Sequence, residues 1–476
     1  MSKVWSKEQE EILNFIKNEK DNLIVRAVAG SGKTSVLVEA AEYVPRGSIF
    51  VAFNKKIVGE LVARLPAHVP ATTFHALCFQ FLRDRLPRGL QVDKFKNLRL
   101  AEKVCKDIGE AKWEVNRLVG LLKNLGVGVI LPYDLDLVEE VRENYDISSD
   151  NATNNIICET AVKVMKRGVK ELDKIDFDDM VYMALHLVIS KGWAMDQYET
   201  VFLDEAQDTN AVQLHLLEKM CKRLVAVGDD WQAIYGFRGA GSNSMPDIEE
   251  QFACVNLPMT ISWRCPVLAR DIVQKYVPHF QCRDDAPLGE VLFIPESDLF
   301  LGYHAGNLIL CRMNYPLFKV AIDLLKRRIP FNMSGSFPSQ LISFVEGFKA
   351  SGLPDLRKKL EAWWIEKERD LSNRGKTGLL AREFDKYQCI LGMIKECDSP
   401  AGLVAFLRQM TQASGGVSLT TIHGAKGLEA ETVVILNPEL IPSEYASTKE
   451  QLQQEENLRY VAETRSKFRL VYCSDK

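Results

Sequence analysis

The feature that most constrains this chain is a glycine-containing loop between an apolar run and a helical pattern. Residues 27–34 read AVAGSGKT, after the apolar run LIV and before the helical pattern VLVEAA. Gly30 and Gly32 let the backbone bend so that its N–H groups point at phosphate oxygens, and a helix beginning near Lys33 adds its positive dipole end. Ala27 stands where the general pattern has its first glycine. A Gly-Ser-rich turn is the alternative, and the Gly-Lys-Thr sequence at a strand-to-helix junction argues against it.

This loop predicts a binding site for a nucleoside triphosphate. Lys33 is expected to reach the β- and γ-phosphates, and the Thr34 hydroxyl is expected to bind Mg²⁺. The residues predicted to contact the nucleotide from this segment are Ala29, Gly30, Ser31, Gly32, Lys33, Thr34 and Ser35.

A second pattern places acidic residues directly after an apolar run. Residues 201–203 read VFL and are followed by DEAQD. Ligands of doubly wound sheets lie at the carboxyl ends of strands, so Asp204 is expected to hold Mg²⁺ and Glu205 to orient and deprotonate the attacking water. Alternatively, Asp204 or Asp208 caps the next helix. Taken with Lys33, the catalytic interpretation is favoured, and the two motifs predict a nucleoside triphosphate hydrolase.

Length and composition set outer limits. A chain of 476 residues is too long for one core, so about two to four domains are expected. The net charge of −4 means that any basic surface must be local. No apolar run approaches the roughly 20 residues that span a bilayer, and the N-terminus lacks the apolar core of a secretory signal. The cysteines contain no Cys-x-x-Cys pair, which argues against zinc and disulfides, and a cytoplasmic location without membrane contact is expected.

Apolar runs alternate with helical patterns along the chain, which is typical of parallel sheets covered by helices. The expected strands are residues 23–25, 48–52, 200–203 and 224–227, then 308–310, 417–421, 432–436 and 470–473. A charged helical region without strand patterns interrupts each series. In the second of these regions, the pair Trp363-Trp364 fits either buried packing or a contact with a partner or duplex.

Residues 227–240 read VGDDWQAIYGFRGA and closely resemble the third motif of UvrD/Rep/PcrA-type superfamily 1 helicases, in the variant of the helicase IV branch. Other segments resemble motifs of the same family in the same order: WSKEQ at 5–9, FNK at 53–55, TTFHAL at 72–77, IDFDDM at 175–180, SWR at 262–264, TTIHGAKGLE at 420–429 and EENLRYVAETR at 455–465. The matches extend along nearly the whole chain, but the two helical regions contain none of them.

The resemblance implies an α/β fold with two RecA-like P-loop motor domains, each with a helical insertion, and ATP with Mg²⁺ as cofactors. The first motor domain is expected at residues 1–83 and 171–262, and the second at residues 263–338 and 416–476. The helical insertions are expected at residues 84–170, resembling domain 1B, and at residues 339–415, resembling a small domain 2B.

The resemblance also implies roles around the nucleotide. Gln9 is expected to read the adenine edge, and Trp263 is expected to stack on adenine. Gln232 is expected to sense the γ-phosphate, and Glu429 is expected to accept a hydrogen bond from the ribose.

Arg264 and Arg465 resemble the two family arginines that reach the γ-phosphate from the second motor domain. A planar guanidinium suits this role because it offers several donors to spreading negative charge. Ser35 departs from the family pattern, since many relatives carry arginine there to cover the other face of adenine. Weaker base discrimination, with use of other nucleoside triphosphates, is therefore expected.

On the DNA side, the resemblance implies stacking and backbone contacts. Phe53, Tyr235 and Phe237 match family positions on which bases stack, at about 1–3 kcal/mol each. The residues predicted to bind DNA are Phe53, Asn54, His75, Tyr235, Phe237, Arg238 and His423.

The leading interpretation is an ATP-driven translocase on single-stranded DNA that unwinds duplexes, 3′ to 5′ as in the family, with single-stranded DNA and junctions as partners. The alternative is a DNA-dependent NTPase subunit that serves a partner nuclease in repair or phage defence and unwinds weakly alone. The short second helical region favours this alternative, because the Gly-Ile-Gly element with which larger relatives grip duplex is not found. A P-loop kinase or signalling ATPase is a third interpretation, which the motifs at 232–240 and 420–429 argue against.

Overall fold

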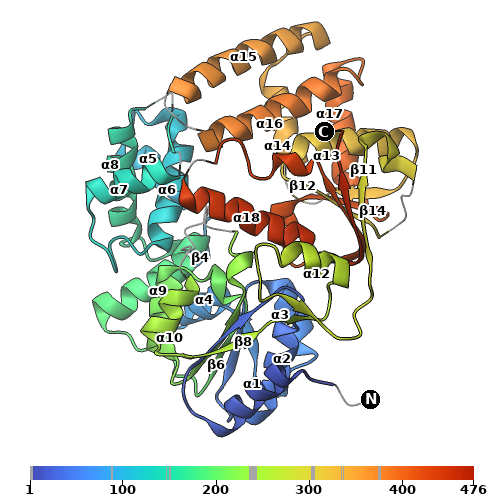
Figure 1. Ribbon diagram of the computed structural model, residues 1–476. Helices are drawn as coiled ribbons and strands as arrows, with labels where there is room; N and C mark the ends of the chain where they lie inside the picture. The colour runs from blue at the N-terminus through green and yellow to red at the C-terminus, as the bar shows by residue number, and fades with distance from the viewer. Residues whose placement is uncertain are drawn as a thin grey trace. The chain divides into compact units, whose positions relative to one another are not determined.

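The computed structural model describes residues 4–86, 89–145, 147–149, 152–234, 244–301, 306–333, 335, 337–373, 377–446 and 448–475. The chain forms two compact units, each built on a six-stranded sheet (Figure 1). The first unit comprises Met1–Ala27 and Gly32–Thr260, and the second comprises Val28–Ser31 and Ile261–Lys476. The described strand pairs are parallel in both sheets, so the predicted α/β class is confirmed.

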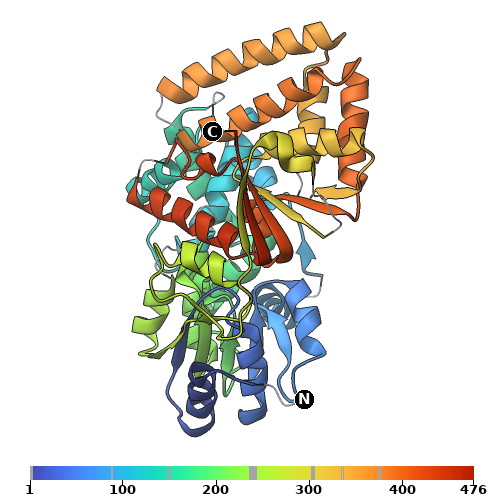
Figure 2. The same ribbon diagram turned by 45° about the vertical axis from the view of Figure 1, so that its right-hand side comes forward.

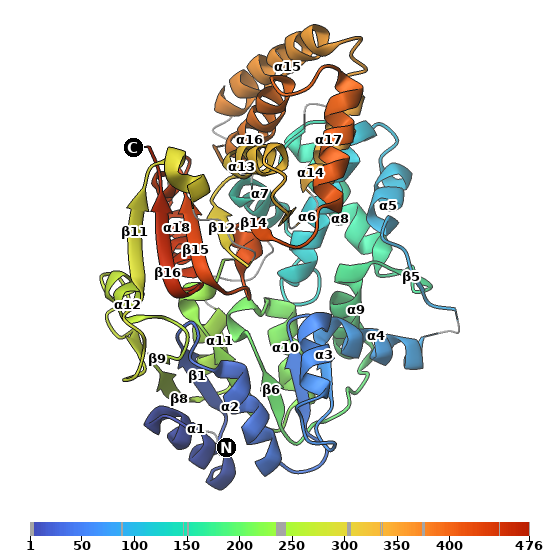
Figure 3. The ribbon, with the colours of Figure 1, turned by 90° about the vertical axis from the view of Figure 1, so that its right-hand side faces the viewer.

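The sheet of the first unit has the strand order β3-β2-β6-β7-β1-β8, and Figure 3 labels its strands β6, β1 and β8. Its strands are β1 Leu23–Ala27, β2 Ile49–Ala52, β3 Ala71–Thr73, β6 Val201–Leu203, β7 Leu224–Gly228 and β8 Val255–Met259. The expected strands β1, β2, β6 and β7 are confirmed within one or two residues, and nearly all of their side chains are buried. β8 lies at the sheet edge, where Pro258 is tolerated because one side of an edge strand makes no ladder hydrogen bonds.

Seven helices accompany this sheet in the described part of the first unit. They are α1 Lys7–Asn18, α2 Lys33–Ala40, α3 Lys55–Val62, α4 Phe74–Arg85, α9 Phe177–Lys191, α10 Ala211–Met220 and α11 Ser244–Gln251. Capping boxes at Ser6, Asp176 and Asn210 begin α1, α9 and α10, because each side chain satisfies an otherwise unpaired N–H of the first turn. The glycine loop follows β1 and the DEAQD segment follows β6, so the parallel sheet brings both predicted motifs to one edge.

The first unit also contains a group of helices between β4 Gln91–Val92 and β5 Lys174–Ile175, which pair in parallel. These helices are α5 Lys96–Val104, α6 Lys112–Asn124, α7 Leu135–Asn144 and α8 Asn154–Gly168.

A buried ion cluster joins this helical group to α9. The Lys96 ammonium lies 2.7 Å from Asp179, and Lys123 lies 2.7 Å from Asp176 and 2.8 Å from Asp179. Burial alone would lower the pKa of Lys123, but the two carboxylates outweigh it and raise that pKa. Removing one partner would leave a buried charge uncompensated, which costs about 3–5 kcal/mol in comparable pairs.

The sheet of the second unit has the strand order β11-β16-β15-β12-β14-β13. Its strands are β11 Glu290–Ile294, β12 Leu308–Cys311, β13 Phe331–Met333, β14 Val417–Thr421, β15 Ala430–Leu436 and β16 Ser466–Cys473, beside a small pair of β9 Ile261–Ser262 with β10 Gln281–Cys282. The four strands expected here, β12, β14, β15 and β16, are confirmed, and the sheet places β12 between β14 and β15.

The second unit carries helices α12 Val267–Val273, α13 Asn314–Lys326, α14 Phe337–Gly347, α15 Leu353–Asn373, α16 Thr377–Ile394, α17 Pro400–Gln412 and α18 Lys449–Glu463. The long helices α15 and α16 pack side by side (Figures 1 and 2). Trp364 stacks on Tyr387 at 5.2 Å between ring centroids, and Trp363 packs edge-on to Phe344 at 4.8 Å. The tryptophan pair therefore takes the buried-packing interpretation.

No helix among the described residues is long and apolar enough to cross a membrane. The cytoplasmic location and the boundaries proposed for the motor domains and insertions stay predictions.

Candidate nucleotide-binding site

The glycine loop bends sharply between β1 and α2. Gly30 and Gly32 have φ angles of 73° and 86°, which side chains other than glycine adopt at a cost. Gly32 also lies so close to α1 that a Cβ atom there would come within 3.1 Å of Gln9 Nε2. The predicted adenine-reading amide of Gln9 is therefore at the helix start that the loop forms, and Gln9 also completes the capping box of Ser6.

Thr34 and Asp204, the two residues predicted to hold Mg²⁺, are in direct contact. The Thr34 hydroxyl donates to Asp204 Oδ2 at 2.7 Å, although the two residues are 170 positions apart. Burial and the neighbouring Glu205 raise the pKa of Asp204 to about 6. A hydroxyl and a carboxylate at the end of a strand are oxygen donors that fit Mg²⁺, and a bound cation would stabilise the ionised carboxylate.

Lys33 lies beside an acid that the sequence did not single out. Its ammonium is 4.0 Å from Asp229 Oδ2, at the carboxyl end of β7. Gln232 donates to the same Asp229 oxygen at 2.6 Å, so one buried carboxylate orients both the lysine and the predicted γ-phosphate sensor. An acid directly after a buried strand was the signal for Asp229, the same signal that identified Asp204.

Glu205 has a left-handed backbone, with φ 54° and ψ 44°. This conformation is rare for residues other than glycine and is concentrated at functional sites. The Gln207 amide donates to Glu205 Oε2 at 2.5 Å. The alternative that Asp204 or Asp208 caps the next helix is wrong, because the side-chain cap of α10 is Asn210.

Ser35 is partnered by a cation from another helix. Arg64, just after α3, donates to the Ser35 hydroxyl at 3.3 Å. At the position where many relatives carry arginine, Ser35 is therefore in contact with the guanidinium of Arg64, which lies just after α3. Sequence periodicity could not have predicted the contact between Arg64 and Ser35, because the two residues are 29 positions apart.

A cavity of about 400 Å³ connects the acids of β6 with predicted DNA-binding residues of the same unit. Asp204 and Glu205 form part of its wall, and Phe53, Asn54 and His75 form another part. Phe53 is 41 % exposed, whereas Asn54 caps α3 by accepting from the Ile57 N–H at 3.0 Å. Burial lowers the pKa of His75. Tyr235, Phe237 and Arg238 lie outside the described residues.

Asp178 also lines this cavity, and its environment disfavours its charge. Burial and then the neighbouring Asp176 raise its pKa from 3.8 to about 6. The native state therefore binds a proton that the unfolded chain releases, and the stability of the unit falls as the pH rises through this window.

Asp178→Asn is expected to increase the free energy of unfolding by about 1–2 kcal/mol near neutral pH, because the amide never ionises. The gain should shrink as the pH falls and vanish at about pH 3, where Asp178 of the unmodified protein is protonated in both the folded and the unfolded state. Urea unfolding at both pH values measures it, with exposed Asp173→Asn as the control. An equal gain at both pH values would contradict the titration of Asp178.

In the second unit, Arg264 and Glu429 form an ion pair. Arg264 Nε and Nη2 each lie 2.7 Å from Glu429 Oε2, and Nη1 donates to the Thr464 carbonyl at 3.2 Å. Lys467 binds the other carboxylate oxygen at 2.6 Å. Burial opposes the charge of Glu429, but Lys467 and Arg264 together lower its pKa. The predicted ribose acceptor thus holds the predicted phosphate-binding arginine.

Arg465 is 1 % exposed and is held by backbone oxygens. Its Nε donates to the Val461 carbonyl at 2.9 Å and its Nη1 to the Leu428 carbonyl at 3.3 Å. Trp263 Nε1 is buried and has no hydrogen-bond partner in the part of the chain that the structure describes. His423 lies in the 3-10 turn after β14.

The loop residues of the second unit have contacts of their own. The Trp263 N–H donates to the Gly30 carbonyl at 2.8 Å, and the Ala29 N–H donates to the Tyr460 hydroxyl at 2.7 Å. Ser31 is buried, and its hydroxyl donates to the Val28 carbonyl at 2.7 Å. Sequence patterns did not identify Tyr460 as a partner of the loop, since it reads as a core aromatic.

Comparison with known proteins identifies the family. Residues 5–253 match the UvrD/REP helicase N-terminal domain, and residues 391–475 match the UvrD-like helicase C-terminal domain. The chain is 27 % identical over 267 residues to the ATP-dependent DNA helicase PcrA of Leuconostoc citreum, covering 50 % of this chain and 34 % of that protein. It is 27 % identical over 270 residues to PcrA of Staphylococcus aureus, covering 51 % and 36 %. The chain thus spans about a third of the length of these relatives.

The two matching domains correspond to two RecA-like motor domains, in agreement with the two parallel sheets. The first match alone covers more than half of the chain. The chain belongs to the UvrD/Rep helicase family.

Proposed function

We propose that this protein is an ATP-dependent translocase on single-stranded DNA that unwinds duplexes with 3′-to-5′ polarity. The observation that carries the proposal is the convergence of Lys33, Thr34, Asp204 and Glu205 at the carboxyl edge of one parallel sheet. A hydroxyl and a carboxylate 2.7 Å apart, with a lysine beside them, form a set suited to a metal-bound triphosphate. PcrA relatives are described as ATP-dependent DNA helicases, which supports the same activity here.

In this proposal each residue of the site would have its own role in ATP hydrolysis. Lys33 would neutralise charge on the β- and γ-phosphates, and Thr34 with Asp204 would hold Mg²⁺, which would supply screening of the developing charge. Glu205 orients the attacking water and accepts its proton. Asp229 holds the side-chain amide of Gln232 in place. Gln232 would contact the γ-phosphate, and its position would then depend on whether that phosphate is present.

The shared cavity in the first unit supports coupling between hydrolysis and DNA. Asp204 and Glu205 line the same space as Phe53 and His75, so movement of a base or phosphate on one wall can reach the catalytic acids on the other. Aromatic stacking suits a translocase because every base has a π-face, and binding is then independent of sequence.

An unwinding assay with 3′-tailed and 5′-tailed duplexes tests the proposal. We expect ATP-dependent strand separation on the 3′-tailed duplex only. No stimulation of ATPase by single-stranded DNA would exclude a DNA motor altogether.

The second candidate is a DNA-dependent NTPase subunit that acts with a partner nuclease and unwinds weakly alone. The described second helical region, α14 to α17 within residues 337–412, is small and favours it. Full DNA stimulation of ATPase combined with no strand separation by the isolated chain would select this candidate.

Phe53→Ala is expected to weaken single-stranded DNA binding about tenfold and to reduce DNA-stimulated ATPase, because it removes a stacking surface worth about 1–3 kcal/mol. Its ring is 41 % exposed, so the melting temperature should hardly change. Anisotropy with labelled oligonucleotides measures DNA binding, and thermal melting measures stability.

The matched comparison is Phe74→Ala: this ring is 6 % exposed, and its loss should destabilise the fold by about 3–5 kcal/mol. A large fall in melting temperature for Phe53→Ala would identify Phe53 as a core residue instead.

A further inference from the structure

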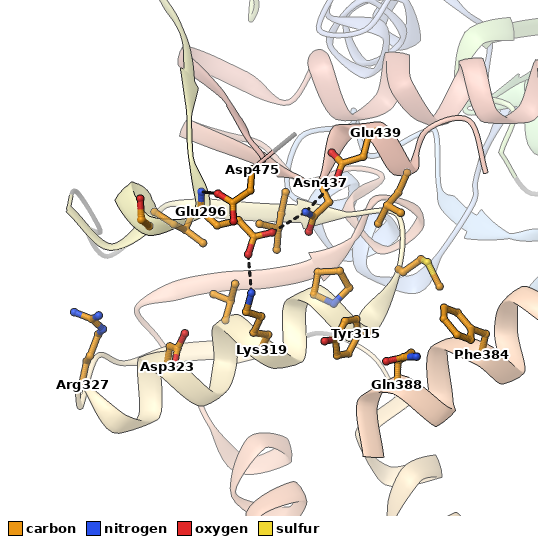
Figure 4. A pocket seen from close by; sticks show the side chains of 17 residues that line it. Glu296, Tyr315, Lys319, Asp323, Arg327, Phe384, Gln388, Asn437, Glu439 and Asp475 are labelled. Atoms are coloured by element: carbon orange, nitrogen blue, oxygen red, sulfur yellow. Dashed lines mark hydrogen bonds and ion pairs between the residues drawn. The ribbon is translucent and has the colours of Figure 1, made fainter. Parts of the chain in front are cut away.

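The second unit contains a cavity of about 730 Å³ that the proposed hydrolysis and DNA binding do not use (Figure 4). Four neighbouring parallel strands end at it. Glu296 follows β11, Asp475 follows β16, Asn437 follows β15 and Met313 follows β12. From β12 the chain continues to β13 at one edge of the sheet, and from β15 it continues to β16 in the direction of the opposite edge. Open α/β sheets bind their ligands at the carboxyl ends of strands where the connections diverge in this way.

The cavity has an aromatic end and an acidic end. Tyr315 of α13 and Phe384 of α16 stand at one end, and Glu296, Glu439 and Asp475 stand at the other (Figure 4). Apolar side chains such as Leu436 and Leu440 complete the wall. Its volume falls within the range of about 300–1,000 Å³ that is typical of ligand sites.

The charges of the wall exclude an anionic occupant. Four carboxylates line the cavity against two cations, Lys319 and Arg327. Lys319 is already paired with Glu296 at 2.7 Å, and this pair lowers the pKa of Glu296.

The start of α13, where a phosphate could otherwise bind, is filled by the protein itself. The Asp385 carboxylate accepts from the Asn314 N–H at 2.9 Å and from the Tyr315 N–H at 2.7 Å. A phosphate or nucleic acid would therefore meet occupied backbone donors at the start of α13 and a wall with more acidic than basic side chains.

The acidic end retains capacity for a cation. Glu439 accepts from the Asn437 amide at 3.3 Å and from the Ser474 hydroxyl at 2.9 Å, and Asp475 accepts from the Glu296 N–H at 2.8 Å. These donors are neutral, and each carboxylate has further lone pairs for a charged donor. The same contacts hold both carboxylates in place before any ligand arrives.

We propose that this cavity is a docking site for a basic segment of a partner protein. An arginine or lysine of that segment places its charge against Glu439 and Asp475, and its aliphatic stem lies along Leu440. A neighbouring apolar residue of the partner packs on Tyr315 and Phe384. Charge-assisted hydrogen bonds to carboxylates fix the orientation, while the aromatic wall supplies buried apolar area.

The test uses a fluorescein-labelled peptide of alternating leucine and arginine, with a leucine–glutamine peptide as the comparison, titrated with the full chain at low salt. Anisotropy should show saturable binding of the basic peptide only. The double variant Glu439→Gln/Asp475→Asn keeps the side-chain shapes and should weaken binding at least about fivefold. Exposed Asp398→Asn, in the same unit but outside the cavity, should leave it unchanged.

Gln388 of α16 lines the cavity and allows a test of opposite sign. Gln388→Glu should strengthen binding of the basic peptide, and Gln388→Lys should weaken it. DNA-stimulated ATPase should be unaffected in all of these variants, which separates this proposal from the proposed motor function. Equal binding of the glutamine peptide, indifference to the double variant, or displacement of the peptide by equimolar spermidine or a single-stranded oligonucleotide would overturn it.

Discussion

Glu205→Gln is expected to reduce ATP hydrolysis by about 10²–10⁴-fold while leaving ATP binding intact. The substitution removes the general base and keeps the shape of the side chain, and general-base catalysis contributes a factor of this size. The Gln207 amide that donates to Glu205 Oε2 can still donate to the new amide oxygen. Steady-state phosphate release measures the rate, and titration with a fluorescent ATP analogue measures the affinity.

Glu199→Gln is the matched control, since Glu199 precedes the opposite end of the same strand and pairs with Lys222 at the surface. This variant should hydrolyse ATP normally. Turnover close to the unmodified protein in Glu205→Gln would remove Glu205 from the catalytic machinery, and another acid would then have to activate the water.

Replacing Arg465 or Arg264 by alanine is expected to lower kcat about 10³–10⁵-fold, with a much smaller change in nucleotide affinity. A guanidinium that stabilises charge only in the transition state leaves ground-state binding almost unchanged. Arg264 lies at Glu429 and Arg465 at backbone carbonyls, so each must exchange these partners for phosphate oxygens. Single-turnover hydrolysis and equilibrium nucleotide binding separate the two quantities.

A structural explanation makes a different prediction for Arg465. If its hydrogen bonds to Val461 and Leu428 matter only for folding, Arg465→Ala lowers the melting temperature and the activity together. Arg469→Ala is the control, because it breaks an ion pair to Glu290 on the same sheet without touching these carbonyls. If either alanine variant weakened nucleotide binding but kept an unchanged kcat, that result would contradict a contact between the arginine and the transition state.

Much of the fold was predictable from local patterns. Strands such as β1 and β12 are short apolar runs bounded by loops, and the apolar run alone predicts them. The glycine loop also predicted where α2 begins, because Gly32 adopts the left-handed conformation directly before the helix. Strands β3, β8, β11 and β13 of the two main sheets escaped prediction. Strands β3 and β13 have only three residues each, whereas β8 and β11 are partly exposed edge strands, and β8 contains proline.

Within the candidate site, the sequence by itself determined the residue types and their order along the chain: the loop with Lys33 and Thr34, the acids after β6, and the family to which the chain belongs. Only the tertiary structure decided which of them meet. Asp229 became the partner of Lys33 and Gln232, Arg64 the partner of Ser35, and Glu429 the partner of Arg264.

The docking cavity of the second unit depends on tertiary structure in the same way. Three of its four acids, Glu296, Glu439 and Asp475, follow β11, β15 and β16, which become neighbours through the strand order of the sheet. Local propensity acts over a few residues and so specifies each strand and each loop. Strand order arises from burying all the apolar strands together, and it alone brings their carboxyl ends, with the polar residues that follow them, to one edge.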